Sequence, residues 1–178
     1  MIELGDHYLA DVRGRFLSLK GLADAALQQA DADFFTVLGP EDNSLAVIVK
    51  HLSGNMISRW GNLKGDGESR TRNRDAEFII HEGRDELMAA WERGWETLFR
   101  ALDAQTPDSL LDTVTIRGEA HSVVAAINRQ LSHYAYHVGQ IVFLAKHFQA
   151  EAWETLSIPR GGSAAFNQKM LGDVDTKK

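Results

Sequence analysis

The chain has 178 residues, no cysteine and a formal net charge of −6 at pH 7. A chain of this length buries about 70% of its unfolded surface, so it needs no disulfide or metal ion to fold, and without cysteine any metal must be held by histidine, carboxylate or water. The net negative charge, with acidic and basic residues interspersed, argues against direct nucleic-acid binding. No apolar run approaches the roughly 20 residues that span a bilayer, so we expect a soluble, cytoplasmic protein.

The first part of the chain predicts one long helix and a connection. Apolar residues recur at steps of three and four from about residue 3 to residue 30, which is the pattern of an amphipathic helix. Residues 31–43 contain Gly39-Pro40 and several acids, so they predict a connection to the next helix.

The second predicted helix has an unusual polar flank. It starts at an N-cap offered by Asn43 or Ser44 and continues through SLAVIVKHLSGNMISRWGNL. Beside its apolar stripe lie polar residues without formal charge, namely Ser44, His51, Asn55, Ser58 and Asn62. A solvent-facing helix more often carries lysine and glutamate, so this flank predicts a semi-buried lining. His51 is its only strong metal ligand; a histidine bonded to a neighbouring carbonyl is the alternative interpretation.

Residues 65–81 have no sustained apolar period and predict a long loop. Asp75 and Glu77 could bind a metal or a substrate amine, and the three arginines between residues 70 and 74 could meet an anionic group. A solvated, charged loop is the default interpretation of such a segment.

A third helix is predicted from about residue 82 to residue 104. Trp91 and Trp95 lie on its apolar stripe as core or interface aromatics. The following segment, LLDTVTIR at residues 110–117, is β-branched enough for a short strand, and a small hairpin with Ala120 and His121 would complete it.

The fourth predicted helix carries a pair of histidines one turn apart. Ser122 offers its N-cap, and the helix runs to about Gln149. His133 and His137 stand at i, i+4 beside the apolar stripe, which is the spacing that two metal ligands on one helix need. A chance pair, or a hydrogen-bonded pair at the edge of the core, is the alternative.

Together these elements predict an all-α fold. Four helices, each with one apolar stripe, are typical of a four-helix bundle, here over residues 1–150. The long link between the second and third helices suits a crossover between parallel neighbours. Residues 151–178 predict a C-terminal extension packed on or trailing from the bundle, extended at first and with a final turn around residues 166–171.

Four sequence motifs carry a resemblance to a known family: KHLSGNMISRW at residues 50–60, RNRD at 72–75, TIRGEAHSV at 115–123 and HYAYHVGQIVFLAK at 133–146. With them, the chain resembles the DinB/YfiT-like superfamily, and most closely its DUF1572 branch, to about residue 167. The resemblance implies a divalent metal, commonly nickel or zinc, held by motif histidines that match His51, His133 and His137. Some members of the superfamily are S-transferases or isomerases that use low-molecular-weight thiols.

A site of this kind would have a definite chemistry. Three neutral imidazoles leave a divalent charge unneutralised and a coordination position open, so the ion can lower the pKa of a bound water or thiol. We therefore expect a metal-dependent thiol S-transferase or hydrolase that acts on a small molecule. The alternatives are a non-catalytic metal- or ligand-binding bundle, or the stress-associated interaction protein that the superfamily name suggests. Asn55, Tyr134 and Gln140 are candidates for the surrounding shell, although none is a strong general base.

The chain has seven histidines, and the other four compete for a ligand role on composition alone. His121 and His147 lie about 15 Å or more along the fourth helix from the paired histidines. Geometry does not exclude His7 and His81, but their neighbours give no supporting apolar stripe.

The tryptophans bear on assembly. Trp91, Trp95 and Trp153, together with the habit of the superfamily, predict that a second copy covers one face of the bundle. We therefore expect a homodimer with a small-molecule substrate and without nucleic-acid or membrane partners.

Overall fold

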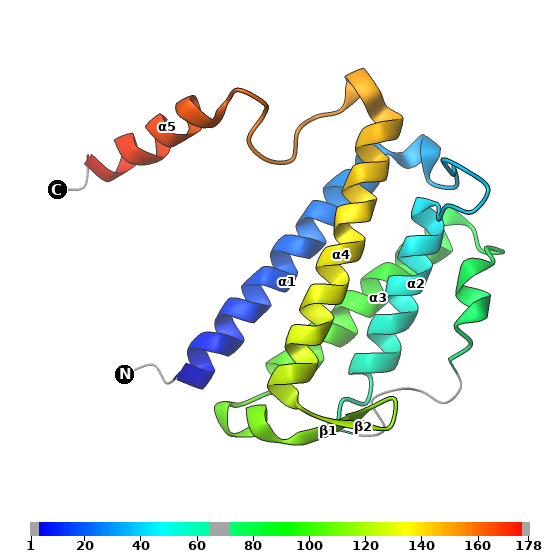
Figure 1. Ribbon diagram of the computed structural model, residues 1–178, viewed down its shortest axis with the longest axis vertical. Coiled ribbons are helices and arrows are strands. Elements are labelled where there is room, and N and C mark those ends of the chain that lie inside the picture. The colour runs from blue at the N-terminus through cyan, green and yellow to red at the C-terminus, as the bar shows by residue number, and fades with distance from the viewer. Residues whose placement is uncertain (1–3, 65–71, 176–178) are drawn as a thin grey trace.

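The computed structural model describes residues 4–64 and 72–175 (Figure 1). Within these ranges the chain forms five α-helices and one two-stranded antiparallel sheet, which confirms the all-α expectation with a short hairpin. The helices are α1 (Leu4–Gln29), α2 (Leu45–Trp60), α3 (Arg84–Asp103), α4 (Val123–Gln149) and α5 (Ser163–Asp175). The strands are β1 (Thr113–Ile116) and β2 (Glu119–Ser122), and short 3-10 turns are η1 (Asp31–Asp33), η2 (Asp75–Phe78), η3 (Pro107–Leu111) and η4 (Ala150–Ala152). None of the helices in the described ranges is long and apolar enough to span a bilayer.

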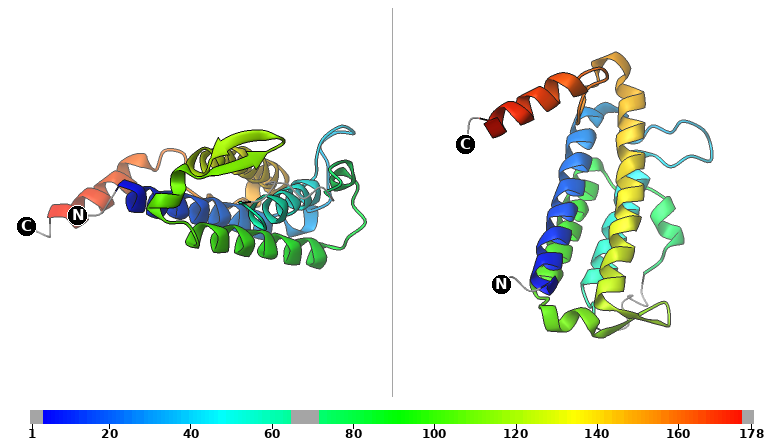
Figure 2. Two further views of the ribbon diagram at one scale, coloured as in Figure 1. Left: turned by 90° about the horizontal axis from the view of Figure 1, so that it is seen from below. Right: turned by 60° about the vertical axis from the view of Figure 1, so that its left-hand side comes forward.

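Helices α1 to α4 lie side by side as a bundle (Figures 1 and 2). Helices α2 and α3 both begin at the end of the bundle where α1 finishes, since Ala46 N–H donates to Phe34 and Arg84 pairs with Asp31. They are therefore parallel neighbours, joined by the predicted crossover. Helix α4 runs in the opposite direction to α2 (Figure 1). The two helices are in contact, and one face of α2 lies opposite one face of α4.

Two serines begin helices as the sequence predicts. The Ser44 hydroxyl accepts from the Val47 N–H of α2, and the Ser122 hydroxyl accepts from the Ala125 N–H of α4. The predicted hairpin precedes α4, with Thr113 opposite Ser122 across β1 and β2. Its turn places Arg117 and Gly118 at φ values of 55° and 82°, which suits a two-residue hairpin turn.

The core contains aromatic side chains from all four helices of the bundle, packed with aliphatic ones. Trp91 and Trp95 are fully buried and meet edge to face with ring centroids 5.5 Å apart. The prediction that these two tryptophans lie at a dimer interface is therefore wrong, because they are buried on the interior face of α3. Gly94 between them lets α2 approach, since a Cβ there would lie 2.9 Å from the Met56 methyl group.

The C-terminal extension contains more helix than the sequence predicts. Instead of one turn around residues 166–171, α5 is a 13-residue helix that projects from the bundle (Figure 1). Phe166, Met170 and Leu171 are exposed on it.

Candidate metal centre

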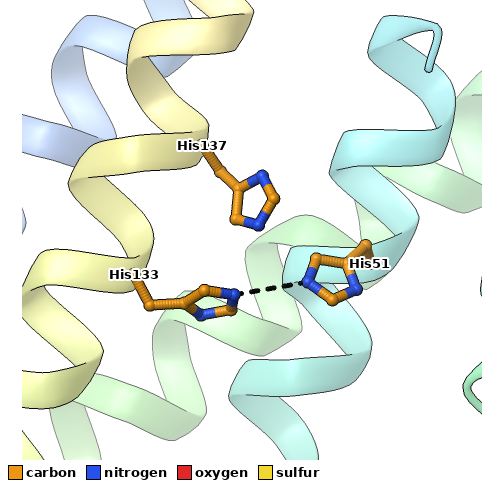
Figure 3. A group of neighbouring side chains, drawn as sticks. All are labelled: His51, His133 and His137. Carbon is orange, nitrogen blue, oxygen red and sulfur yellow. Dashed lines mark hydrogen bonds between the residues drawn. The ribbon is translucent and has the colours of Figure 1, made fainter. Parts of the chain in front are cut away.

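The structure brings the three predicted histidines together between α2 and α4. His51 comes from α2, His133 and His137 come from α4, and their imidazoles point toward one another (Figure 3). One ligand atom of each lies within 4.8 Å of the others. In the described part of the chain, these three form the only group of histidine, aspartate or glutamate side chains with such geometry, so His7, His81, His121 and His147 are outside it.

The spacing of the nitrogens matches what a metal ion needs. The Nε2 atoms of His51 and His133 lie 3.4 Å apart. Two imidazole nitrogens bound to one tetrahedral ion, each about 2.05 Å from it, are separated by about 3.3 Å. The ring centroids of His133 and His137 are 4.8 Å apart, and those of His51 and His137 are 4.9 Å apart. The donor set therefore fits a divalent ion after small side-chain rotations.

Glu77 of the crossover orients His51. Its Oε2 accepts a hydrogen bond from Nδ1 of His51 at 2.9 Å. Because a carboxylate only accepts, the His51 proton is on Nδ1, and the Nε2 lone pair faces the other two histidines. Arg72 holds the same carboxylate with two hydrogen bonds, of 2.6 Å from Nε and 2.8 Å from Nη2.

The position of Glu77 corrects the default interpretation of the crossover. The sequence favours a solvated charged loop there, yet Glu77 is only 6% exposed and Arg72 is largely buried against it. Gly54 of α2 makes room for this packing, because a Cβ at that position would lie 2.8 Å from Glu77 Oε1. Asp75, the other acid proposed for this segment, is exposed, and Arg70 lies outside the described residues.

A second hydrogen bond orients His137. Its Nδ1 donates to the Gln140 side-chain oxygen at 2.7 Å, so the His137 Nε2 lone pair is directed into the triad. His133 has no equivalent support, because its buried Nδ1 has no hydrogen-bond partner among the described residues. The tautomers of His51 and His137 are therefore set before any ion arrives.

The other two shell candidates belong to a buried network rather than to the triad. The Asn55 side-chain oxygen accepts from Gln130 at 2.6 Å and from the Tyr134 hydroxyl at 3.0 Å. Trp60 Nε1 donates to the same hydroxyl at 3.0 Å. Burial raises the pKa of Tyr134, so its phenol stays protonated. Asn55 and Tyr134 join α2 to α4 beneath the histidines, whereas Gln140 contacts a histidine directly.

The environment keeps the two histidines of α4 neutral near pH 7. Burial, with the adjacent His137 and His51, lowers the pKa of His133 to about 4. Burial also lowers the pKa of His137, although its bond to Gln140 opposes the shift. Burial alone would raise the pKa of Glu77, but hydrogen bonds from His51 and Arg72 outweigh it and lower the pKa. Both α4 imidazoles therefore offer lone pairs, and the carboxylate behind His51 is ionised.

We expect Glu77→Gln to weaken divalent-metal affinity by about 10- to 100-fold, because a neutral amide orients His51 less firmly than a carboxylate. Titration of nickel or zinc against a competing chelator measures this affinity. Asp75→Asn is the matched control, since it removes an exposed acid from the same turn. Equal affinities for the two variants would show that Glu77 does not support the ligand.

Comparisons with known proteins identify one family. A family model described as "Protein of unknown function (DUF1572)" matches residues 3–162 of the chain. Neither a curated protein nor a solved structure matches the chain.

Proposed function

We propose that this chain, which belongs to the DUF1572 family, binds one divalent metal ion through His51, His133 and His137 and acts on a small molecule there. The observation that carries the proposal is the 3.4 Å separation of the Nε2 atoms of His51 and His133, with His137 beside them. Nickel and zinc both suit an imidazole donor set. The sequence motifs support placing the family within the DinB/YfiT-like superfamily.

The residues around the triad favour a thiol over water as the reacting group. A bound ion would supply Lewis acidity, which lowers the pKa of a water or thiol. Among the described residues, no carboxylate beside the triad is available as a base, because Glu77 is held by Arg72 and His51. A thiol, with a pKa of about 8.5, needs a far smaller shift to ionise near pH 7 than water, with a pKa of about 15.7. We therefore favour a thiol S-transferase over a hydrolase.

The same observation supports a second candidate, a bundle that binds metal or a ligand without catalysis. Apart from the three histidines, the described residues that contact the triad orient it but have no means of taking a proton from a substrate. The two functions differ in whether a low-molecular-weight thiol changes state at the site.

Metal analysis of protein purified without a histidine tag tests the proposal. We expect one nickel or zinc ion per chain, and loss of that ion in the variant with all three histidines changed to alanine. Adding a small thiol to protein loaded with Co²⁺ or Ni²⁺ should then change its visible absorption spectrum, and turnover of an electrophile would separate the transferase from the binding protein. Equal metal content in wild type and triple variant would refute the site.

The proposed homodimer rests on different residues from those that the sequence indicated. The apolar side chains of α5 are exposed, and a helix of 13 residues is only marginally stable without packing. A second copy that covered α5 would account for both features. Sedimentation of the protein at micromolar concentration measures the state of association, and a single monomeric species would contradict the dimer.

A further inference from the structure

A groove lies next to the triad, along the seam between α2 and α4. Its cavity has a volume of about 420 Å³ and is closed on one side by the connection that precedes α2. This volume is within the range of about 300 to 1,000 Å³ that small-molecule sites occupy. The walls include Leu38, Ile48, Tyr136, Gly139, Gln140 and Phe143.

The groove shares residues with the support of the metal centre. Gln140, which accepts the hydrogen bond from His137, also lines the groove. The Tyr136 ring meets the His137 imidazole edge to face, with centroids 5.0 Å apart. Ile48 stands about one helical turn from His51 on α2. A molecule in the groove therefore has one end beside His137.

The walls and rim of the groove differ in chemistry. Tyr136 and Phe143 are each 64% exposed, which is unusual for large aromatic side chains on one helix face. Glu41 and Asp42 line the groove from the connection and bring negative charge to it. Aromatic faces and carboxylates both attract a cation, and both disfavour an anion.

We propose that this groove binds the distal part of the substrate, and that this part is an apolar body with an ammonium group. The apolar body packs between the aromatic side chains of α4 and the aliphatic wall formed by Leu38 and Ile48. The ammonium group pairs with the acidic rim. This inference rests on the proposed function in one respect, namely that the reacting end of the molecule points toward the triad.

Gly139 provides a way to fill the groove without disturbing the bundle. A Cβ at this position would meet nothing within 4 Å, so a side chain can be added without a clash with neighbouring atoms. Gly139→Trp places a large ring in the cavity, whereas Gly139→Ala adds a single methyl group and is the matched control. A second pair of changes, Glu41→Gln with Asp42→Asn, removes the charge of the rim and keeps its shape.

The probes are 2-phenylethylamine, 2-phenylethanol and 3-phenylpropionate, each titrated by NMR against metal-free protein. We expect wild type and Gly139→Ala to bind the amine equally and more tightly than the other two probes, and Gly139→Trp to lose at least about tenfold in affinity. Removing the two rim charges should weaken amine binding by about 1.4- to fivefold, the range for an exposed charge pair, and leave the alcohol unchanged.

Three outcomes would overturn the inference. Amine binding by Gly139→Trp at wild-type affinity would place the ligand elsewhere, and equal affinity for the propionate would refute the cationic preference. A wild-type dimer that Gly139→Trp dissociates, with no amine binding, would show that a second copy covers the groove. Failure of the metal site is measured separately, because His51→Ala should lose the ion and keep the amine, whereas Gly139→Trp should keep the ion.

Discussion

His137→Ala is expected to lose metal affinity by at least about 100-fold, beyond the typical loss when only a group behind a ligand is changed. Two imidazoles remain, and neither can replace the third donor. The bundle should stay folded, because the large apolar core does not depend on the ion. Removing one half-buried imidazole should cost about 1 to 3 kcal/mol of unfolding free energy at most.

The measurements are bound metal per chain and thermal unfolding by circular dichroism, for wild type, metal-stripped wild type and His137→Ala. His147→Ala is the control, since it removes an exposed histidine from the same helix, outside the triad. If stripping the metal from wild type left an unfolded chain, the ion would be a structural staple, and the catalytic proposal would lose its physical basis.

Trp95→Ala should destabilise the bundle by about 3 to 5 kcal/mol, the range for a large aromatic removed from a core. Trp95 is 1% exposed and its ring contacts those of Trp91, Phe99 and Tyr134. The substitution leaves a cavity next to Tyr134, which follows His133 on α4. We therefore expect the packing beneath the three histidines to become looser as well. Urea unfolding measures the loss as a lower midpoint at constant slope.

Trp95→Phe separates packing from polar contributions. The Trp95 Nε1 atom is buried and has no hydrogen-bond partner in the described ranges, so phenylalanine removes an unsatisfied polar group and offsets part of the packing that it loses. We expect this variant to cost less than about 1.5 kcal/mol, as for other substitutions that largely keep an apolar volume. Equal losses for the two variants would mean that ring packing around Trp95 does not stabilise the core.

The helices and two of the histidines could be predicted from local patterns. Apolar periodicity gives the extent of α1 to α4, and a single serine side chain marks the start of α2 and of α4. The i, i+4 spacing alone puts His133 and His137 on one face. The uncharged flank of α2 indicates His51, and in the structure His51 faces α4.

Glu77 could not be predicted as a partner of His51, because nothing local indicates which face of the bundle a crossover will contact. The segment has no apolar period, and its charged composition resembles that of a solvated loop. Gly54 is the one local sequence feature that agrees with this contact, since it has no side chain at the point of α2 where Glu77 packs. Trp91 and Trp95 show a different limit of sequence patterns. Periodicity identifies an apolar stripe on a helix, but it does not say whether that stripe packs in the core or against a second copy.

The wide separation of the three histidines along the chain has a consequence for the order of events during synthesis. His51 and His133 are 82 residues apart, so His51 leaves the ribosome about 4 to 16 s before His133 at typical elongation rates. In that interval α2 can already dock against α3, because their contact through Met56 and Gly94 needs no later residue. The flank of α2 that carries His51 and Asn55 is polar, so it exposes little apolar surface before α4 has been made. The proposed metal site can therefore be complete only in a chain that has been made at least as far as His137 of α4.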